Sequence, residues 1–299
     1  MNDRQQELLE RYPFAACEYS RALALKCPGF AKQVNPDPCE LDDDDGDWSE
    51  DPFGEEDESA GCFGLKQRFP DRVLVMASDS CFMNCRHCTR KGLLRRAEIV
   101  RTDEELQTCL SYVQDHPLVR DVLVSGGDPL VLPDDEVLRF VDAFVDMKQV
   151  EVVRLCTRAP CVNPSRITPE LATRLGRSGK VWVNTQFNCA GEVTPEAAEA
   201  CAHLVKAGIP VSCQTVLMAG VNDSADQMLD LFRALQRARV RPYYVFQCDP
   251  VAGISHFRVP LERAQQIERE CAERIGGLGL PRFVADLPGS KRKTPIAEL

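Results

Sequence analysis

Three cysteines in one short stretch carry the clearest chemical signal of the sequence. Cys81, Cys85 and Cys88 follow an apolar run with C-x3-C-x2-C spacing. Three thiolates on one loop can bind three irons of a [4Fe-4S] cluster, which leaves the fourth iron open for chemistry. The alternative is a Cys3His zinc site that includes His87, because structural zinc takes four nearby ligands.

A glycine pair marks a second candidate site. Ser125, Gly126, Gly127 and Asp128 follow the next apolar run of the chain. Glycine lets a backbone approach a ligand closely, and α/β barrels bind their ligands at the carboxyl ends of the strands. The alternative is a turn that only requires a positive φ.

The elements that must position these residues form a repeating pattern. Short β-branched runs alternate with helical patterns, which predicts a parallel α/β sheet. Thr102 and Glu105 match a capping box, and Thr194 with Pro195 begins another helix. Periodicity alone does not choose between a barrel and an open doubly wound sheet. The predicted strands cover 72–77, 121–125, 151–156, 181–185, 210–217 and 241–246.

Residues 1–65 lack this pattern, so we expect an irregular N-terminal extension before a catalytic domain at 66–299. The stretch 42–58 is rich in Asp and Glu and is predicted to be a solvated acidic loop. Cys27, Cys39 and Cys62 of the extension are a candidate metal-binding set.

Composition narrows the function classes. The 299-residue chain has a formal net charge of -10, which disfavours nucleic acid as a partner. It has no apolar run that could span a membrane and no signal segment, so we expect a cytoplasmic protein with no membrane partner. In a reducing compartment most of its 15 cysteines should pack as small apolar residues. The clearest examples are Cys109, Cys201, Cys213 and Cys271.

The cysteine spacing after the first predicted strand resembles the signature of the radical S-adenosylmethionine (SAM) superfamily. The resemblance implies a partial (β/α)6 TIM-like barrel and a [4Fe-4S] cluster on the three cysteines. It also implies that SAM binds the open iron and that one electron cleaves it to methionine and a 5'-deoxyadenosyl radical. A reducing partner of the flavodoxin or ferredoxin type would supply that electron.

Longer stretches narrow the resemblance to the lysine 2,3-aminomutase family, which moves an α-amino group to Cβ. The similarity covers about residues 48–295. It is carried by the stretches 68–72, 85–90, 125–130, 166–171, 181–185, 220–223, 241–244, 247–249, 256–258 and 293–295.

This second resemblance implies pyridoxal 5'-phosphate as a further cofactor, carried on the matching Lys293. In isolation Lys293 could equally be a surface lysine of a basic tail. Arg68 and Arg72 match residues near the coenzyme phosphate. The run from Ser125 to Asp128 and Gln214 are expected near SAM.

The same resemblance implies a small amino acid substrate with a cationic side chain. Arg90 matches the arginine that pairs with the substrate carboxylate, since a guanidinium can hold it by two hydrogen bonds. Asp249 and Asp286 match the acids that receive the side-chain ammonium, and a neutral or anionic tail there would leave both unpaired.

Departures from the family pattern keep alternatives open. Phe69 stands where a tyrosine is usual, Gln186 replaces a histidine, and the usual glycine-rich run before the lysine is the bulkier Gly289-Ser-Lys-Arg. The chain ends at Leu299, before the C-terminal segment of the long aminomutases, so a homodimer is only one candidate oligomeric state.

Three alternative functions are also compatible with the sequence. The first is an aminomutase that acts on arginine or makes β-lysine for the modification of elongation factor P. The second is a radical SAM enzyme with another outcome, such as elimination or epimerisation. The third is a non-catalytic metal-binding module.

Overall fold

The computed structural model describes residues 3–43, 48–57, 60–61, 63–92, 102–290 and 292–299. Within these residues one sheet has nine strands in the order of the chain. Its seven central strands run parallel. They are β2 (Arg72–Ser78), β3 (Asp121–Gly126), β4 (Val152–Cys156), β5 (Val181–Thr185), β6 (Val211–Leu217), β7 (Arg241–Gln247) and β8 (Arg282–Ala285). All six strands predicted from the sequence are present.

Two antiparallel strands form the edges of this sheet and were not predicted. β1 (Leu65–Phe69) pairs with β2, and β9 (Thr294–Pro295) pairs with β8. No pairing between β1 and β9 closes the sheet among the described residues. The fold is therefore a partial barrel, which confirms the expected architecture. Both edge strands are short and mixed in character, so neither shows a clear period of two.

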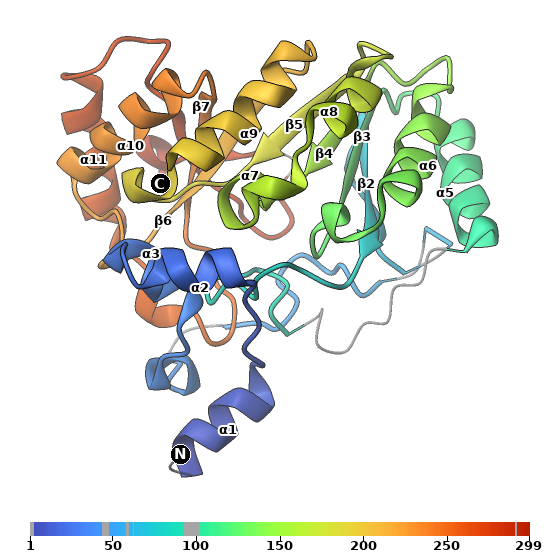
Figure 1. Ribbon diagram of the computed structural model, residues 1–299. Helices are drawn as coiled ribbons and strands as arrows, with labels where there is room; N and C mark the ends of the chain where they lie inside the picture. The colour runs from blue at the N-terminus through green and yellow to red at the C-terminus, as the bar shows by residue number, and fades with distance from the viewer. Residues whose placement is uncertain (1–2, 44–47, 58–59, 62, 93–101, 291) are drawn as a thin grey trace.

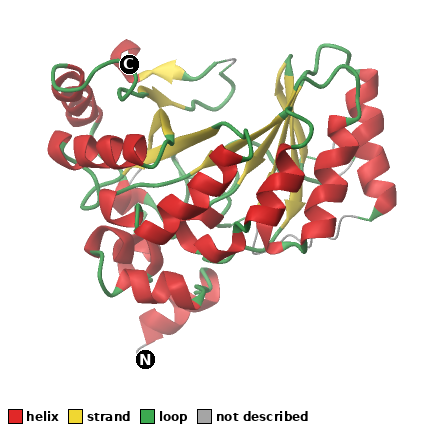
Figure 2. Ribbon diagram, turned by 45° about the horizontal axis from the view of Figure 1, so that its top comes forward, coloured by secondary structure: helices red, strands yellow, loops and turns green. Residues whose placement is uncertain are grey.

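The outer face of the sheet is covered by helices (Figure 2). Two of the helices begin at the caps predicted for them. The Thr102 and Thr194 side chains each accept a hydrogen bond from a backbone N–H in the first turn of the helix that follows. Between sheet and helices the β-branched side chains are buried, as in other parallel sheets. The helices are α5 (Asp103–Asp115), α6 (Asp134–Val145), α7 (Ala159–Val162), α8 (Pro169–Gly176), α9 (Pro195–Lys206), α10 (Ala225–Arg237) and α11 (Leu261–Ala272). Short 3-10 turns are η2 (Pro129–Val131), η3 (Pro164–Arg166), η4 (Ala190–Glu192), η5 (Ser255–Phe257) and η6 (Ile296–Glu298).

The N-terminal extension is more regular than expected. It contains α1 (Asp3–Arg11), α2 (Glu18–Ala24), α3 (Pro28–Val34) and the 3-10 turn η1 (Pro38–Leu41). Figure 1 shows α1 standing away from the sheet, while α2 and α3 lie against the barrel. Phe30 and Val34 of α3 belong to the main hydrophobic core. Two helices of seven residues leave little periodic signal, so tertiary packing rather than pattern stabilises them.

Cysteine packing follows the expectation. Cys109, Cys201, Cys213 and Cys271 are all buried in the core. Of the three cysteines that were a candidate metal-binding set in the extension, Cys27 is half-buried and Cys39 is exposed. The third, Cys62, lies outside the described residues. No described helix is long and apolar enough to cross a membrane.

Candidate active site

A cavity of about 410 Å³ lies on the concave face of the sheet. Alternate residues of the strands face it, for example Leu74, Leu123, Arg154 and Tyr244. The intervening residues point toward the helices, as the period of two requires. The residues predicted to bind the cluster, the cofactors and the substrate all line this one cavity. These are Arg68, Arg72, Cys81, Cys85, Cys88, Arg90, Ser125, Gly126, Gly127, Asp128, Gln214, Asp249, Asp286 and Lys293.

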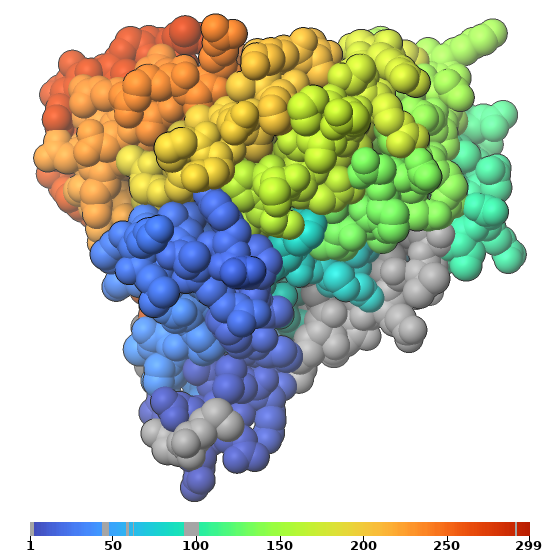
Figure 3. Space-filling view, in the orientation of Figure 1, coloured from blue at the N-terminus to red at the C-terminus, as the bar shows by residue number. Residues whose placement is uncertain are grey.

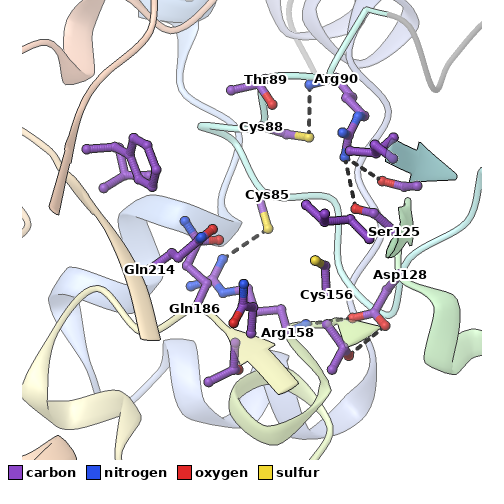
Figure 4. Close-up of a pocket in the computed structure, with 18 of the residues that line it drawn as sticks. Cys85, Cys88, Thr89, Arg90, Ser125, Asp128, Cys156, Arg158, Gln186 and Gln214 are labelled. Atoms are coloured by element: carbon purple, nitrogen blue, oxygen red, sulfur yellow. Dashed lines mark hydrogen bonds between the residues drawn. The ribbon is translucent and has the colours of Figure 1, made fainter. Parts of the chain in front are cut away.

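The three cysteines line the cavity from the loop that follows β2, and this part of the cavity is called the sulfur end. Figure 4 shows two of them, Cys85 and Cys88. Arg158 Nη1 donates to Cys85 Sγ at 3.0 Å, and the Arg90 backbone N–H donates to Cys88 Sγ at 3.3 Å. Burial raises the pKa of the Cys88 thiol to about 11 and that of Cys81 well above its usual range. Thiolates in this place therefore need a strong cation beside them, and iron is such a cation.

The zinc alternative needs His87 as its fourth ligand. In the described ranges no three His, Cys, Asp or Glu side chains lie close enough to hold a single metal ion, and this applies to the three cysteines as well, so only the place of His87 tests the alternative. His87 is buried, with Nε2 3.4 Å from Asn188 Nδ2 and its ring edge-on to Phe257. Burial also lowers the pKa of His87 well below its usual value. We therefore read His87 as a packed core residue.

The glycine pair brings the end of β3 against the cysteine loop. Gly126 has φ +120°, and a Cβ there would lie 2.2 Å from the Ser78 carbonyl oxygen. A Cβ on Gly127 would lie 2.3 Å from the carbonyl oxygen of Ser80. Gly126 must be glycine because of its positive φ and its close contact, and Gly127 because of its close contact alone. Both contacts are with this chain's own backbone and not with a ligand. The contact fixes the loop that carries Cys81.

Asp128 is engaged within the protein. Its buried carboxylate accepts hydrogen bonds from Thr157 Oγ1 at 2.7 Å, from the Arg158 N–H at 2.8 Å and from the Leu130 N–H at 3.0 Å. These bonds hold the turn after β4, which in turn places the Arg158 side chain beside Cys85.

Arg90 already binds a carboxylate in this structure. Its Nε and Nη2 donate to the two oxygens of Glu55 at 2.6 and 2.7 Å, while Nη1 donates to the Gly126 carbonyl oxygen at 3.1 Å. Glu55 belongs to the stretch predicted to be a solvated acidic loop, and for this residue the prediction was wrong. Its side chain is only 11% exposed, because the guanidinium offsets the cost of burying the charge.

Charged groups from both edges of the sheet gather at the other end of the cavity. The Asp286 carboxylate contacts Lys293 Nζ and accepts from Arg68 Nη2 at 3.0 Å. Burial, and next the nearby Arg68, lower the pKa of Lys293 to about 8. Burial raises the pKa of Asp249 to about 7. Arg72 pairs with Asp71 at 3.1 Å and lies over the Phe69 ring.

Known proteins with similar sequences belong to a family that agrees with this site. Residues 75–232 match the family model of the Radical SAM superfamily. L-lysine 2,3-aminomutase of Fusobacterium nucleatum is 41% identical over 91% of this chain and 63% of its own length. A putative L-lysine 2,3-aminomutase of Treponema pallidum is 38% identical over 83% of this chain and 70% of its own.

The chain belongs to the radical SAM superfamily and, within it, to the lysine 2,3-aminomutase family. The fold agrees, because the structure of Streptococcus suis SuiB bound to S-adenosylmethionine aligns with a TM-score of 0.55. That alignment has 14% identity and covers 73% of this chain and 51% of SuiB. The chain spans about three-fifths of the length of the Fusobacterium nucleatum relative.

Three residues of this radical SAM site escaped the sequence analysis: Glu55, Arg154 and Arg158. Arg154 is the one with a readable signal, because an arginine inside a β-branched strand must face a polar space. It donates through Nε to Asp121 at 2.9 Å. Glu55 and Arg158 find their partners 35 and 73 residues away in sequence, so no local pattern marks them.

Proposed function

We propose that this chain is a pyridoxal-phosphate-dependent radical SAM 2,3-aminomutase for an amino acid with a cationic side chain, with L-lysine as the leading substrate. The observation that carries the proposal is that one cavity is lined by the three cysteines of the loop after β2 together with Arg90, Lys293, Asp249 and Asp286. Membership in the lysine 2,3-aminomutase family supports it.

The sulfur end suits a [4Fe-4S] cluster and SAM. Cys81, Cys85 and Cys88 would hold the cluster, because three partly buried thiols on one loop line the same cavity. When bound, cluster and SAM supply a radical that removes hydrogen from an unactivated carbon. The hydrogen bond from Arg158 to Cys85 would steady the thiolate charge. An electron would come from a small carrier of the flavodoxin or ferredoxin type.

The opposite end suits pyridoxal phosphate. Lys293 reaches the cavity with a pKa lowered to about 8, so a useful fraction of its amine is uncharged and nucleophilic near neutral pH. Arg68 and Arg72 line the same space and could hold a phosphate. When bound, the coenzyme supplies the π system that lets an amino nitrogen pass between neighbouring carbons.

Charge balance favours a cationic substrate. Asp286 has Lys293 and Arg68 as partners, and the partly buried Asp249 lies near the same two cations and Arg258. Once Lys293 is engaged by the coenzyme, both acids lose an ammonium group. The side-chain ammonium of a lysine-like substrate can take its place, since buried carboxylates without a partner are costly.

The carboxylate of the substrate would go to Arg90. The Glu55 side chain supports this role, because the Arg90 guanidinium donates two hydrogen bonds to its carboxylate from the cavity side. Substrate and Glu55 would then compete for the same two N–H groups.

The experiment is an anaerobic assay of reconstituted protein with SAM, dithionite and pyridoxal phosphate. L-lysine, L-arginine and L-glutamate are followed in parallel by chromatography and mass spectrometry. A β-amino isomer of lysine or arginine would support the proposal and identify the substrate. If deoxyadenosine forms but no amino acid isomerises, the radical chemistry stands and the aminomutase proposal fails.

A further inference from the structure

Cys27 and Cys189 form a pair of thiols outside the cavity. Their Sγ atoms lie 3.5 Å apart although 162 residues separate them in sequence. Cys27 comes directly before α3 of the N-terminal extension, and Cys189 comes directly before η4, after β5. Figure 3 shows the N-terminal segment, in blue, packed against the yellow part of the barrel. Both cysteines are partly exposed.

A glycine two residues after each cysteine makes the contact possible. A Cβ on Gly191 would lie 2.7 Å from Cys27 Sγ, and a Cβ on Gly29 would lie 3.3 Å from Cys189 Sγ. Neither glycine has a positive φ, so the missing side chain rather than the backbone conformation matters here. Two C-x-G segments therefore face each other, and each leaves room for the sulfur of the other.

The two thiols differ in acidity. The hydrogen bond from Cys189, helped by the backbone N–H groups of Phe30 and Gly29, lowers the pKa of Cys27 to about 7. The same hydrogen bond, then burial and the nearby Glu192, raise the pKa of Cys189. Cys27 is thus the more acidic thiol of the pair, an asymmetry that suits Cys27 as the attacking and Cys189 as the resolving thiol.

We propose that Cys27 and Cys189 are a redox modification site, which low-molecular-weight disulfides such as oxidised glutathione convert to a disulfide between the N-terminal extension and the barrel. The Cys27 thiolate attacks the small disulfide, forms a mixed disulfide and releases one small thiolate. Cys189 then loses its proton toward Glu192, whose carboxylate lies 3.4 Å from its sulfur, and attacks the Cys27 sulfur. The second small thiolate leaves, so two electrons pass to the small disulfide.

The bond would tie α3 to groups that reach the cysteine loop. Gln33 of α3 donates to Glu192 at 2.5 Å, and Glu192 also accepts from the Asn188 backbone N–H at 2.8 Å. Arg158, within 3.5 Å of Glu192, donates to Cys85. Oxidation would therefore fix the extension over the turns that follow β4 and β5. In a reducing compartment such a bond would be transient, as redox-sensing disulfides are.

The test uses the anaerobically reconstituted protein, so that the cavity cysteines are occupied. It is incubated with oxidised glutathione, alkylated and digested without reductant, and the peptides are identified by mass spectrometry. We expect a peptide pair joined through Cys27 and Cys189 that disappears on reduction. Oxidation should also raise the Tm by about 5 °C or more, since the new bond restrains a long loop of the unfolded chain.

Matched variants make the outcome decisive. Cys27→Ser and Cys189→Ser should each abolish the joined peptide, and Cys189→Ser should accumulate glutathione on Cys27. Cys39→Ser, at the exposed thiol of the same extension, should leave the joined peptide unchanged. The proposal is overturned if glutathione modifies Cys39 while Cys27 and Cys189 stay reduced, or if the joined peptide pairs other cysteines. Because the readout is a peptide, the result is independent of any aminomutase activity.

Discussion

At one end of the cavity the three sulfur atoms come from the single loop 81–88, whereas the charged groups at the other end come from positions as distant as Arg68 and Lys293. The sulfur end depends on one turn after β2 and on two glycines that fit it closely. The charged end exists only because β1 and β9 pair with opposite edges of the parallel run. The difference suggests that the two ends load their cofactors independently.

The largest expected effect is at the sulfur end. Cys85→Ala should lower turnover by about 10³-fold or more, because the cluster would lose one of its protein ligands. Iron and sulfide analysis should show a loss of cluster, while the absorbance of bound pyridoxal phosphate persists. Cys39→Ala, outside the cavity, should keep full iron. Loss of both cofactors from Cys85→Ala would contradict independent loading.

The reciprocal change is Lys293→Ala. It should also lower turnover by about 10³-fold, because the proposed coenzyme would have no lysine for its covalent attachment. Here the absorbance near the visible range should vanish while iron stays at the wild-type level. Lys206→Ala, an exposed lysine of α9, is the matched control and should retain both. Unchanged coenzyme absorbance in Lys293→Ala would remove Lys293 from the proposed role.

A smaller effect on activity is expected when the carboxylate of Asp286 is replaced by a neutral amide. Asp286→Asn removes the negative charge that pairs with Arg68 at 3.0 Å and that would bind the substrate ammonium. Breaking such a buried pair costs about 2–3 kcal/mol, so kcat/KM for lysine should fall by about 30- to 150-fold. Asp135→Asn, in an exposed pair with Arg174, should change it by less than about fivefold. A fall for lysine equal to that for L-glutamate would argue against selection by charge.

The pH dependence of coenzyme uptake tests the lowered pKa of Lys293. Only the free amine reacts, so the uptake rate should rise about tenfold per pH unit below pH 8 and level off above the pKa of about 8. Uptake is followed by absorbance from pH 6.5 to 9.5. Arg68→Gln should move the midpoint upward, because Arg68 is one cause of the shift. A rate that still climbs steeply above pH 9 would indicate an ordinary lysine pKa of about 10.4.

The smallest effect concerns Glu55. Glu55→Gln weakens its hold on Arg90, so the substrate carboxylate no longer has to displace a charged partner. The glutamine keeps an amide oxygen that can accept from Arg90, so only part of the pair is lost, about 1 kcal/mol, and KM for lysine should fall by up to about fivefold with little change in kcat. Glu56→Gln removes the same charge from the same loop without lining the cavity and should not change KM. A rise in KM would mean that Glu55 positions Arg90 instead of competing for it.

Local order made part of the molecule predictable. The strands from β2 to β7 could be predicted because buried parallel strands are continuous β-branched runs, and the caps at Thr102 and Thr194 are local motifs. The strands β1, β8 and β9 and the helices α2 and α3 could not, because they are short and depend on what they pack against. Resemblance to a family supplied the distant site residues, which spacing alone would not have joined.

The sequence by itself determined the cysteine loop and the parallel α/β run, since both rest on residues that are neighbours in the chain. Tertiary structure alone decided that Glu55 occupies Arg90, that Arg158 reaches Cys85, and that Cys27 meets Cys189. Each of these contacts joins segments that become neighbours only when the sheet has curved and the extension has packed upon it. These contacts depend on the order of the strands in the sheet and on which side chains are buried. Neither property can be predicted from the spacing of residues that are close in sequence.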